Sequence, residues 1–438
     1  MTLDTLLALG LLLSMGSQLR FGELPVGPGE LCLAAWIVLT FGCQASQRGV
    51  TMTRPFTRML TFWVVFAMAE SLGTVNGYLI RDVHDTGLFL HDVLAYPLMA
   101  AIACLTLLGP RAEARLHRIT WILAALGSLF LAPQLAAGWG IVHLPIVSPW
   151  FGDRFRGWSD NPNQLGLTCA ILAFLALHLA DAATSPAARI AALACSIVPI
   201  CVGRLTKEDT FTFALIVGGP VFILMKLRDW SIPSAGRLTL RSAVALIALT
   251  GGALTSISIV PFAASVGGFA NVGRGLMKDD GKEATREANL RLALWDEAIH
   301  RGLQAAMLGL GPGPHLPIPA SIVLERVSTN PASEQVDRHP AVNGTPNFEA
   351  HNTLLDLFTQ GGLISVVSLL WLIATALFTA YKAQQPGLVT LMCALCIFAM
   401  TGLIIRDPVF WLAVALCLAA GEGTRRHLHG PEMELQRI

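Results

Sequence analysis

Long apolar runs, separated by short polar connections, dominate this chain. Each run approaches the roughly 20 residues that a helix needs to cross a bilayer. Because lipid offers the backbone no hydrogen-bond partners, such runs are expected to be α-helices. The expected spans are 4–19, 28–45, 57–75, 88–109, 119–138, 163–181, 187–203, 209–227, 240–260, 353–380, 386–405 and 408–421. The pattern predicts an all-α polytopic membrane protein with about twelve transmembrane helices.

One long segment, residues 261–350, stands apart from this pattern as the only large part expected outside the membrane. Its stretch "REANLRLALWDEAIHRGLQAA" spaces apolar residues at helical intervals against charged ones, which predicts a short amphipathic helix. From "GLGPGPHLPIPA" onward, proline and glycine predict an irregular cover. We therefore expect residues 1–438 to form a single transmembrane domain, with 261–350 as a large loop between spans 9 and 10.

The composition agrees with a membrane protein and disfavours a metal or disulfide framework. Of the 438 residues, 54% are hydrophobic and only 13% are charged, whereas about a quarter are charged in an ordinary soluble domain. All nine cysteines fall within expected spans, where small interior residues are more common than disulfides or zinc ligands. No metal site is expected.

The basic residues indicate which side of the membrane each connection occupies. If the chain starts inside and crosses twelve times, the connections on the starting side hold fifteen of the thirty lysines and arginines. The short connections on the other side hold seven, and the remaining eight lie in the long loop. Because positive charge is retained on the cytoplasmic side, both termini are predicted to be cytoplasmic and the long loop external.

Several basic residues on the external side depart from that rule and come in small groups. Arg154 and Arg156 precede the sixth span, Arg204 and Lys207 lie between the seventh and eighth, and Arg406 lies between the eleventh and twelfth. If these span ends converge, the guanidinium groups would bind the phosphate oxygens of a lipid-linked phosphate or diphosphate. Taken singly, each could instead be a snorkelling side chain or a local salt bridge, such as Arg406 with Asp407 or Lys207 with Glu208.

Four segments, in this order, resemble one protein family. They are the asparagine-proline-asparagine segment "GWSDNPNQLGL", the arginine loop "VGRLTKEDTFTFALIVG", the arginine-to-tryptophan helix with its glycine turn "RLALWDEAIHRGLQAAMLGLGPG", and the histidine-asparagine motif "HNTLLDLFTQGGL". The chain resembles the O-antigen ligase and polymerase superfamily of bacterial membrane glycosyltransferases over roughly residues 150–380. It departs from the family where glycine precedes Arg204 instead of the common serine, and where "TKED" adds charge around Lys207.

The resemblance implies a C-type glycosyltransferase fold in the bacterial inner membrane that needs no metal or other cofactor. It implies transfer of a glycan from undecaprenyl diphosphate on the periplasmic face. A single large loop between spans 9 and 10 resembles the ligases, which join O-antigen to lipid A-core in lipopolysaccharide biosynthesis, more than the polymerases. The expected partners are that donor, the lipid A-core acceptor and the bilayer, with no nucleic acid. Asn161, Asn163 and Asn352, within the matching motifs, are expected to support the site.

The reaction requires groups that hold the leaving diphosphate and a base for the acceptor hydroxyl. Arg154, Arg156, Arg204 and Arg406 are candidates for the diphosphate, together with Lys207.

The candidate base is His351, because among seven histidines on or near the external side only this one begins a span. With Asn347 as the N-cap, His351 would lie in the first helical turn, where the helix dipole and nearby guanidinium groups keep an imidazole neutral. His351 could instead be an interfacial residue bonded to a loop carbonyl, and Glu349 is a rival base. Arg291 could hold the second phosphate or tie the loop helix down, whereas Trp295 is expected to pack.

Two rival functions remain open at this point. A lipid-glycan or solute transporter could have twelve spans, but its charged residues tend to lie near the membrane midplane, whereas here they gather at one face. Within the enzymes, an O-antigen polymerase or a protein O-oligosaccharyltransferase would use the same donor with another acceptor.

Overall fold

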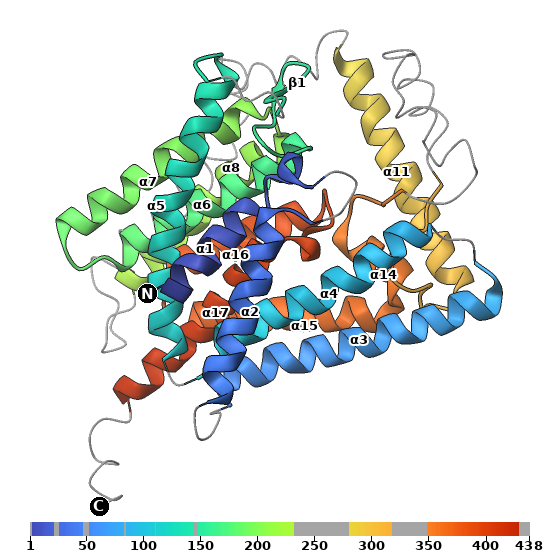
Figure 1. The fold of residues 1–438 in the computed structure, drawn as a ribbon, viewed down its shortest axis with the longest axis horizontal. Coiled ribbons are helices and arrows are strands. Elements are labelled where there is room, and N and C mark those ends of the chain that lie inside the picture. The colour runs from blue at the N-terminus through green and yellow to red at the C-terminus, as the bar shows by residue number, and fades with distance from the viewer. Residues whose placement is uncertain are drawn as a thin grey trace, which may run out of the picture. The chain divides into compact units, whose positions relative to one another are not determined.

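A computed structural model describes residues 2–21, 26–46, 52–82, 85–109, 111–142, 147–231, 280–317 and 348–428 (Figure 1). The expected ninth span, 240–260, lies outside these residues, as does the loop segment 318–347. The described chain is almost entirely helical, which confirms the all-α class.

Eight described helices are long and apolar enough to cross a membrane, so the chain is a multi-pass membrane protein. They are α2 (Pro28–Ala45), α3 (Arg54–Ile80), α4 (Thr86–Leu107), α5 (Ala112–Gly138), α6 (Pro162–Ala182), α7 (Pro186–Leu205), α8 (Asp209–Ser231) and α15 (Gly362–Lys382). Three further apolar helices are shorter, namely α1 (Thr2–Leu13), α16 (Pro386–Ala399) and the apolar part of α17 (Pro408–Leu428). The remaining helices are α11 (Asp280–Gln304) and α14 (Thr353–Gln360), with short 3₁₀ turns at η1 (Ser17–Leu19) and η3 (Ile404–Arg406).

The expected single span over 353–380 is wrong in one respect, because it divides into α14 and α15. Gly362 between them has a φ of +66°, a left-handed conformation that glycine adopts without steric cost. A Cβ there would lie 2.1 Å from the carbonyl oxygen of Met307. The backbone N–H of Leu363 donates to that same oxygen at 2.9 Å, so the segment after α11 packs against the break and replaces helical bonds.

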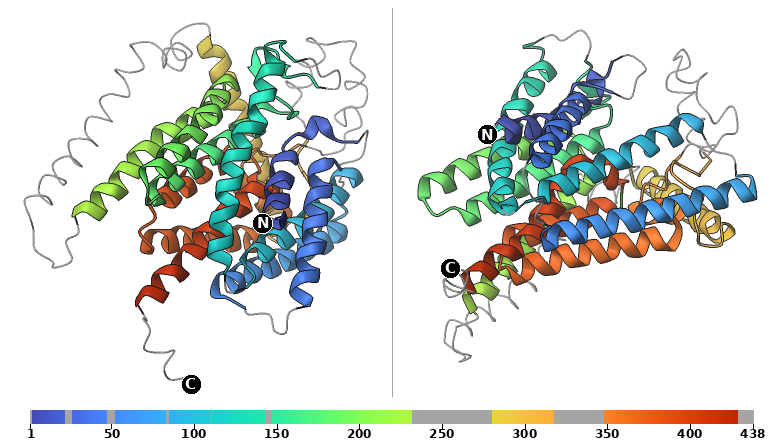
Figure 2. Two further views of the ribbon diagram at one scale, coloured as in Figure 1. Left: turned by 60° about the vertical axis from the view of Figure 1, so that its left-hand side comes forward. Right: turned by 60° about the horizontal axis from the view of Figure 1, so that its bottom comes forward.

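The chain forms two compact units. The first contains 1–69, 90–218 and 364–438, and the second contains 70–89 and 219–363. In the first unit α6 lies at the centre and packs against α5, α7 and α16 (Figures 1 and 2). Nearly all of its side chains are buried, because small and apolar residues occupy every face of this helix.

In the second unit the end of α3 carries the segment that follows α11. Glycines at 73 and 77 let this segment approach, because a Cβ at Gly73 would lie 2.3 Å from the Gln360 carbonyl oxygen and one at Gly77 2.5 Å from that of Leu310. The Asn76 side chain donates to the carbonyls of Ala305 and Gly309 at 2.9 and 2.8 Å. These contacts hold the "GLGPG" turn on α3.

The amphipathic helix expected in the loop is confirmed as α11, and it packs against α14 (Figure 1). Its apolar face contributes Leu294 and Ala298 to a small core with Leu316 and Ala350. An antiparallel bridge between Leu316 and Phe348 joins the described residues that lie on either side of 318–347. Within the described residues 305–317 the backbone is otherwise irregular, as the prolines and glycines predict.

Candidate active site

A short hairpin supports the first group of candidate residues. Strand β1 (Trp150–Phe151) pairs antiparallel with β2 (Arg154–Phe155), a feature that the helical pattern did not predict. The loop after it is held by Gln18 of η1, whose amide donates to the carbonyls of Gly157 and Ser159 at 3.2 and 2.6 Å. Because these bonds join distant parts of the first unit, the hairpin has a defined position.

Both asparagines of the "NPN" segment have a structural role at the start of α6. Asn161 is the N-cap, and its side chain accepts from the backbone N–H of Asn163 at 2.9 Å, while Pro162 occupies the first helical position. The Asn163 side chain in turn accepts from Arg154 at 2.5 Å. The motif therefore starts a helix and positions an arginine.

The structure brings Arg154 and Lys207 together around the connection between α7 and α8, each with a carboxylate. Arg154 donates to the carbonyl oxygen of Thr206 at 3.0 Å and contacts the buried carboxylate of Glu208 at 3.3 Å. Lys207 pairs with Asp153 of the hairpin turn, not with its neighbour Glu208. The ammonium group lowers the pKa of the Asp153 carboxyl, mainly through their hydrogen bond.

Arg156 and Arg204 differ from that pair, because their bonds are to neutral groups. Arg156 donates to the carbonyls of Ser148 at 2.9 Å and Asp160 at 3.4 Å and lies 5.6 Å from the Phe151 ring centre. The exposed Arg204, in the last turn of α7, donates to the Thr212 hydroxyl at 2.5 Å. Since neither guanidinium group pairs with a carboxylate among the described residues, these two side chains are the better candidates to bind an anion.

Arg406 has a partner that the sequence did not suggest. Its guanidinium pairs with Asp92 of α4, which is buried, instead of with the adjacent Asp407. Asp407 instead accepts from the backbone N–H of Val409 at 2.9 Å and begins α17. Burial raises the pKa of Asp407 to about 6.

One bond ties the Arg406 segment to the connection that carries Arg204 and Lys207. The Thr210 hydroxyl, in the first turn of α8, donates to the Thr401 hydroxyl at 3.1 Å. The expected gathering of basic residues is therefore observed for Arg154 and Lys207, with the Arg406 segment at the same end of the first unit. Carboxylates accompany the cations, so the group is mixed in charge.

His351 lies in the second unit and not within a helical turn, so its expected position is wrong. The N-cap of α14 is Asn352, whose side chain accepts from the N–H of Leu354 at 3.0 Å, and the helix starts at Thr353. His351 precedes this cap with a φ of +52°. Asn347 lies outside the described residues. Non-glycine residues with this conformation are uncommon and cluster at functional sites, where the surrounding structure holds the backbone.

Two buried contacts determine this conformation. The carboxylate of Asp356, 3% exposed, accepts from the N–H of Ala350 at 2.7 Å and of Asn352 at 3.2 Å. The Trp295 indole of α11 donates to the carbonyl of Ala350 at 3.2 Å, so Trp295 packs as expected. The residues on both sides of His351 are thereby held in place. Its partly exposed ring lies edge-on to the Phe348 ring, with 5.1 Å between the two ring centres.

Comparison with known families supports the resemblance noted from the motifs. The sequence model described as O-antigen ligase matches residues 194–372, from within α7 to within α15. Residues 194–372 thus belong to the O-antigen ligase superfamily. A comparison with curated proteins gave no match.

The superfamily match contains part of the candidate site. Arg204, Lys207, Arg291, His351 and Asn352 lie inside the matched segment. The "NPN" asparagines, the hairpin arginines and Arg406 lie outside it, so their roles rest on the structure and the motif resemblance. Arg291 lies partly buried on α11, one turn before Leu294 in the small core.

Sequence reasoning missed the residues that position the O-antigen ligase motifs. Asp153, Glu208 and Asp92 pair with the candidate cations, and Asp356 holds the histidine turn. Asp356 accepts from the N-cap N–H as the acidic residue of a capping box does, but it lies four positions after the cap instead of three, so the motif did not reveal it. The other three depend on contacts between segments far apart in the chain.

Proposed function

We propose that this protein is an O-antigen ligase that transfers a glycan from undecaprenyl diphosphate to a sugar hydroxyl of lipid A-core. The superfamily match carries the proposal, since it includes both the arginine loop and the histidine motif. The same donor chemistry with another acceptor would make the protein a polymerase. We further propose an inner-membrane protein with cytoplasmic termini and the reaction on the periplasmic face.

Arg204 and Arg156 would bind the donor diphosphate. In the reaction the bond between the anomeric carbon and the diphosphate oxygen breaks, and the electron pair leaves with the diphosphate. Guanidinium groups that pair with no carboxylate in the described part of the chain are suited to stabilise that growing charge, and the reaction then needs no divalent ion. Arg154 and Arg406, each paired with a buried carboxylate, would instead stabilise the structure around the two anion-binding arginines.

His351 would act as the general base. It would take the proton from the acceptor hydroxyl as that oxygen attacks the anomeric carbon, which favours a direct displacement with inversion. Two features support this role: the left-handed backbone and the buried contacts that hold the turn while leaving the ring partly exposed. Arg291 and Asn352 are assigned to support of His351, and Lys207 to support of the arginines in the first unit.

A reconstitution tests the activity. The purified protein is incubated, without added metal, with undecaprenyl-diphosphate glycan and lipid A-core. Glycan joined to the core is expected; chain growth on the donor would indicate a polymerase, and movement of the donor lipid without new bonds a transporter. The variant His351→Ala is expected to lose transfer and keep donor binding, and full activity in it would remove His351 from the mechanism.

A matched pair of arginines on α7 tests the diphosphate contact. Arg204 and Arg189 are both exposed but lie at opposite ends of this helix. Arg204→Ala removes a charge-assisted contact and is expected to reduce kcat/KM by about 10- to 1,000-fold. Arg189→Ala is expected to remain near wild type. Equal effects of the two substitutions would contradict a specific role for Arg204.

A further inference from the structure

A buried histidine in the loop segment has an oxygen acceptor at each of its two ring nitrogens. His315 follows the "GLGPG" turn and is 2% exposed. Its Nε2 atom lies 2.8 Å from the carbonyl oxygen of Gly311, and its Nδ1 atom lies 3.1 Å from a carboxylate oxygen of Asp82, which follows α3. The ring and both acceptors belong to the second unit.

Two acceptors require a ring that donates from both nitrogens. A neutral imidazole has one N–H and one lone pair, whereas an imidazolium ring donates twice. The Gly311 carbonyl only accepts, so the Nε2 atom has to donate to it. The Asp82 carboxylate also lies 3.4 Å from the Arg301 guanidinium of α11, which stabilises its negative charge, so the Nδ1 atom has to donate as well. The surroundings therefore fit an imidazolium ring.

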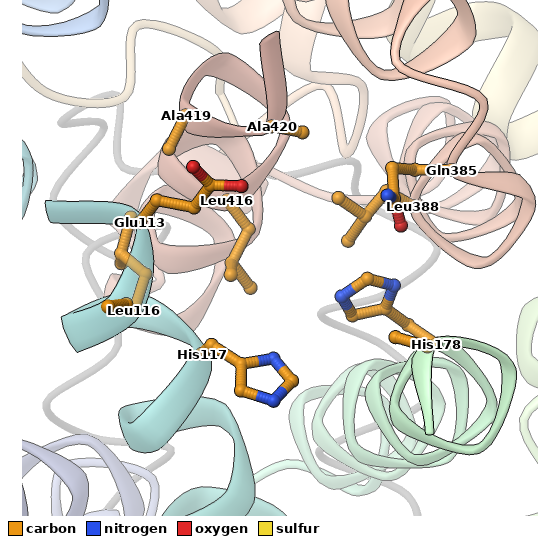
Figure 3. Close-up of a pocket in the computed structure, with 11 residues that line it drawn as sticks. Glu113, Leu116, His117, His178, Gln385, Leu388, Leu416, Ala419 and Ala420 are labelled. Carbon is orange, nitrogen blue, oxygen red and sulfur yellow. The ribbon is translucent and has the colours of Figure 1, made fainter. Parts of the chain in front are cut away.

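Burial by itself does not create this situation, as a second buried histidine shows. His178 of α6, in the first unit, is 6% exposed and borders a cavity of about 380 Å³ (Figure 3). Its Nδ1 atom has no hydrogen-bond partner among the described residues. No acceptor there requires a second ring proton, whereas at His315 the Asp82 carboxylate does.

The end of α3 holds Asp82 in position for this bond. Arg81 has a left-handed φ of +57°, and its N–H donates to the Tyr78 carbonyl at 3.2 Å. The N–H of Asp82 donates to the Gly77 carbonyl at 2.9 Å. Together these bonds form a Schellman motif, which ends a helix and fixes the residue that follows. Asp82 is therefore a fixed point to which His315 is attached.

The residue after His315 connects it to the candidate base. Leu316 exchanges both backbone hydrogen bonds with Phe348, at 3.2 and 3.0 Å. The Phe348 ring lies edge-on to the His351 ring, with 5.1 Å between the ring centres. Leu316 also shares the small core with Ala350, the residue before His351. A shift of His315 would therefore displace the neighbours of the base.

We infer that His315 is a protonated positioning residue, whose imidazolium ring ties the loop segment to Asp82 and so holds Phe348 against His351. This role rests on the proposed transfer reaction with His351 as the base. When a rise in pH removes the second ring proton, one of the two bonds is lost and the segment loosens. Transfer then falls on the alkaline side, whereas deprotonation of His351 raises it on the acidic side, so the rate passes through a maximum.

This pH dependence arises among a small set of charged groups. Asp82 pairs with the ring directly, and Arg301 shares that carboxylate. The other charged or titratable groups next to these contacts are Glu297, which pairs with Arg301 at 3.4 Å, Asp85, which accepts from the N–H groups at the start of α4, and Glu349 and His351, which follow the bridged Phe348.

The first test compares His315→Gln with wild type in the transfer assay over about pH 5 to 8. Glutamine can donate to one acceptor but has no proton to lose in this range. The variant is expected to lower the maximal kcat about 10- to 100-fold, as loss of one charge-assisted bond implies, and to abolish the alkaline fall. Donor KM is expected to stay within about twofold. His300→Gln, at an exposed histidine of α11, is the matched control and is expected to keep the wild-type rate and pH profile.

Two further measurements separate this role from a general loss of structure. Asp82→Asn weakens the same bond from its other side, so the double variant with His315→Gln is expected to lower kcat no more than the stronger single variant. Nitrogen NMR of histidine-labelled protein identifies the His315 signals by their absence in His315→Gln. It is expected to show two protonated ring nitrogens, one of which loses its proton over the pH range of the alkaline fall.

Three results would overturn the inference: a His315 ring that never carries two protons in this range, additive losses in the double variant, and an alkaline fall that persists in His315→Gln. If the wild type transfers no glycan, the proposed function fails, and the protonated bridge is decided by the NMR titration and by amide hydrogen exchange over residues 348–351 in Asp82→Asn. Faster exchange there supports the bridge, and unchanged exchange contradicts it.

Discussion

The buried carboxylate of Asp356 is predicted to set the catalytic rate by holding the His351 turn. It accepts two backbone N–H groups, from Ala350 and Asn352, and so brackets the histidine. In Asp356→Asn the amide keeps one acceptor oxygen, while its NH₂ group faces the other N–H donor. The substitution therefore removes one charge-assisted bond, which is worth roughly 1.5 to 3 kcal/mol.

That loss acts on a backbone conformation that is itself unfavourable. A left-handed non-glycine residue costs roughly 1 to 2 kcal/mol, and His351, with a φ of +52°, has this conformation. Once the restraint weakens, the turn relaxes to other conformations and the fraction with a correctly placed ring falls. At 1.36 kcal/mol per factor of ten, we expect kcat to fall by about 10- to 150-fold.

The assay measures glycan transfer to lipid A-core at varied donor concentration, with amide hydrogen exchange over residues 348–353 as a second readout. We expect kcat to fall, donor KM to stay within about twofold and exchange of the turn to accelerate. Asp296→Asn, at an exposed carboxylate of α11, serves as the control. Wild-type kcat in Asp356→Asn, with the turn still protected, would refute the positioning argument.

Three further predictions concern stability and charge. Gly73→Ala in α3 places a Cβ 2.3 Å from a backbone oxygen and should lower the free energy of unfolding by about 1 to 3 kcal/mol, measured by thermal unfolding. Gly219→Ala in α8 is the control, because its Cβ meets open space and should be neutral or stabilising. Burial raises the pKa of Asp407 from 3.8 to about 6, so the contribution of its protonated form to stability is complete below pH 4 and is lost as pH rises through 6. Asp407→Asn should flatten this pH dependence of the melting temperature. Lys207→Ala should raise the pKa of exposed Asp153 toward its ordinary value, measured by carboxyl NMR titration, and leave the melting temperature unchanged.

The apolar pattern determined the helices because a segment in lipid has few alternatives. The backbone must satisfy its own hydrogen bonds there, so a run such as 28–45 becomes a helix with the same bounds, α2. The amphipathic spacing likewise predicted α11, and the ordered motifs indicated the superfamily. These features depend on residues close together in the chain.

Tertiary contacts decided what those residues do. The span expected over 353–380 breaks at Gly362 because a segment 55 residues earlier in the chain, at Met307, packs there, and Asn352 instead of Asn347 begins the helix. Arg406 pairs with Asp92, 314 residues away, instead of with its neighbour. The strength and partner of a charge depend on which groups folding brings within a few ångströms, and local spacing carries little information about that. The sequence by itself thus determined most of the helices, the superfamily and the candidate residues. Only the tertiary structure decided which arginines pair with carboxylates among the described residues and how the histidine is held.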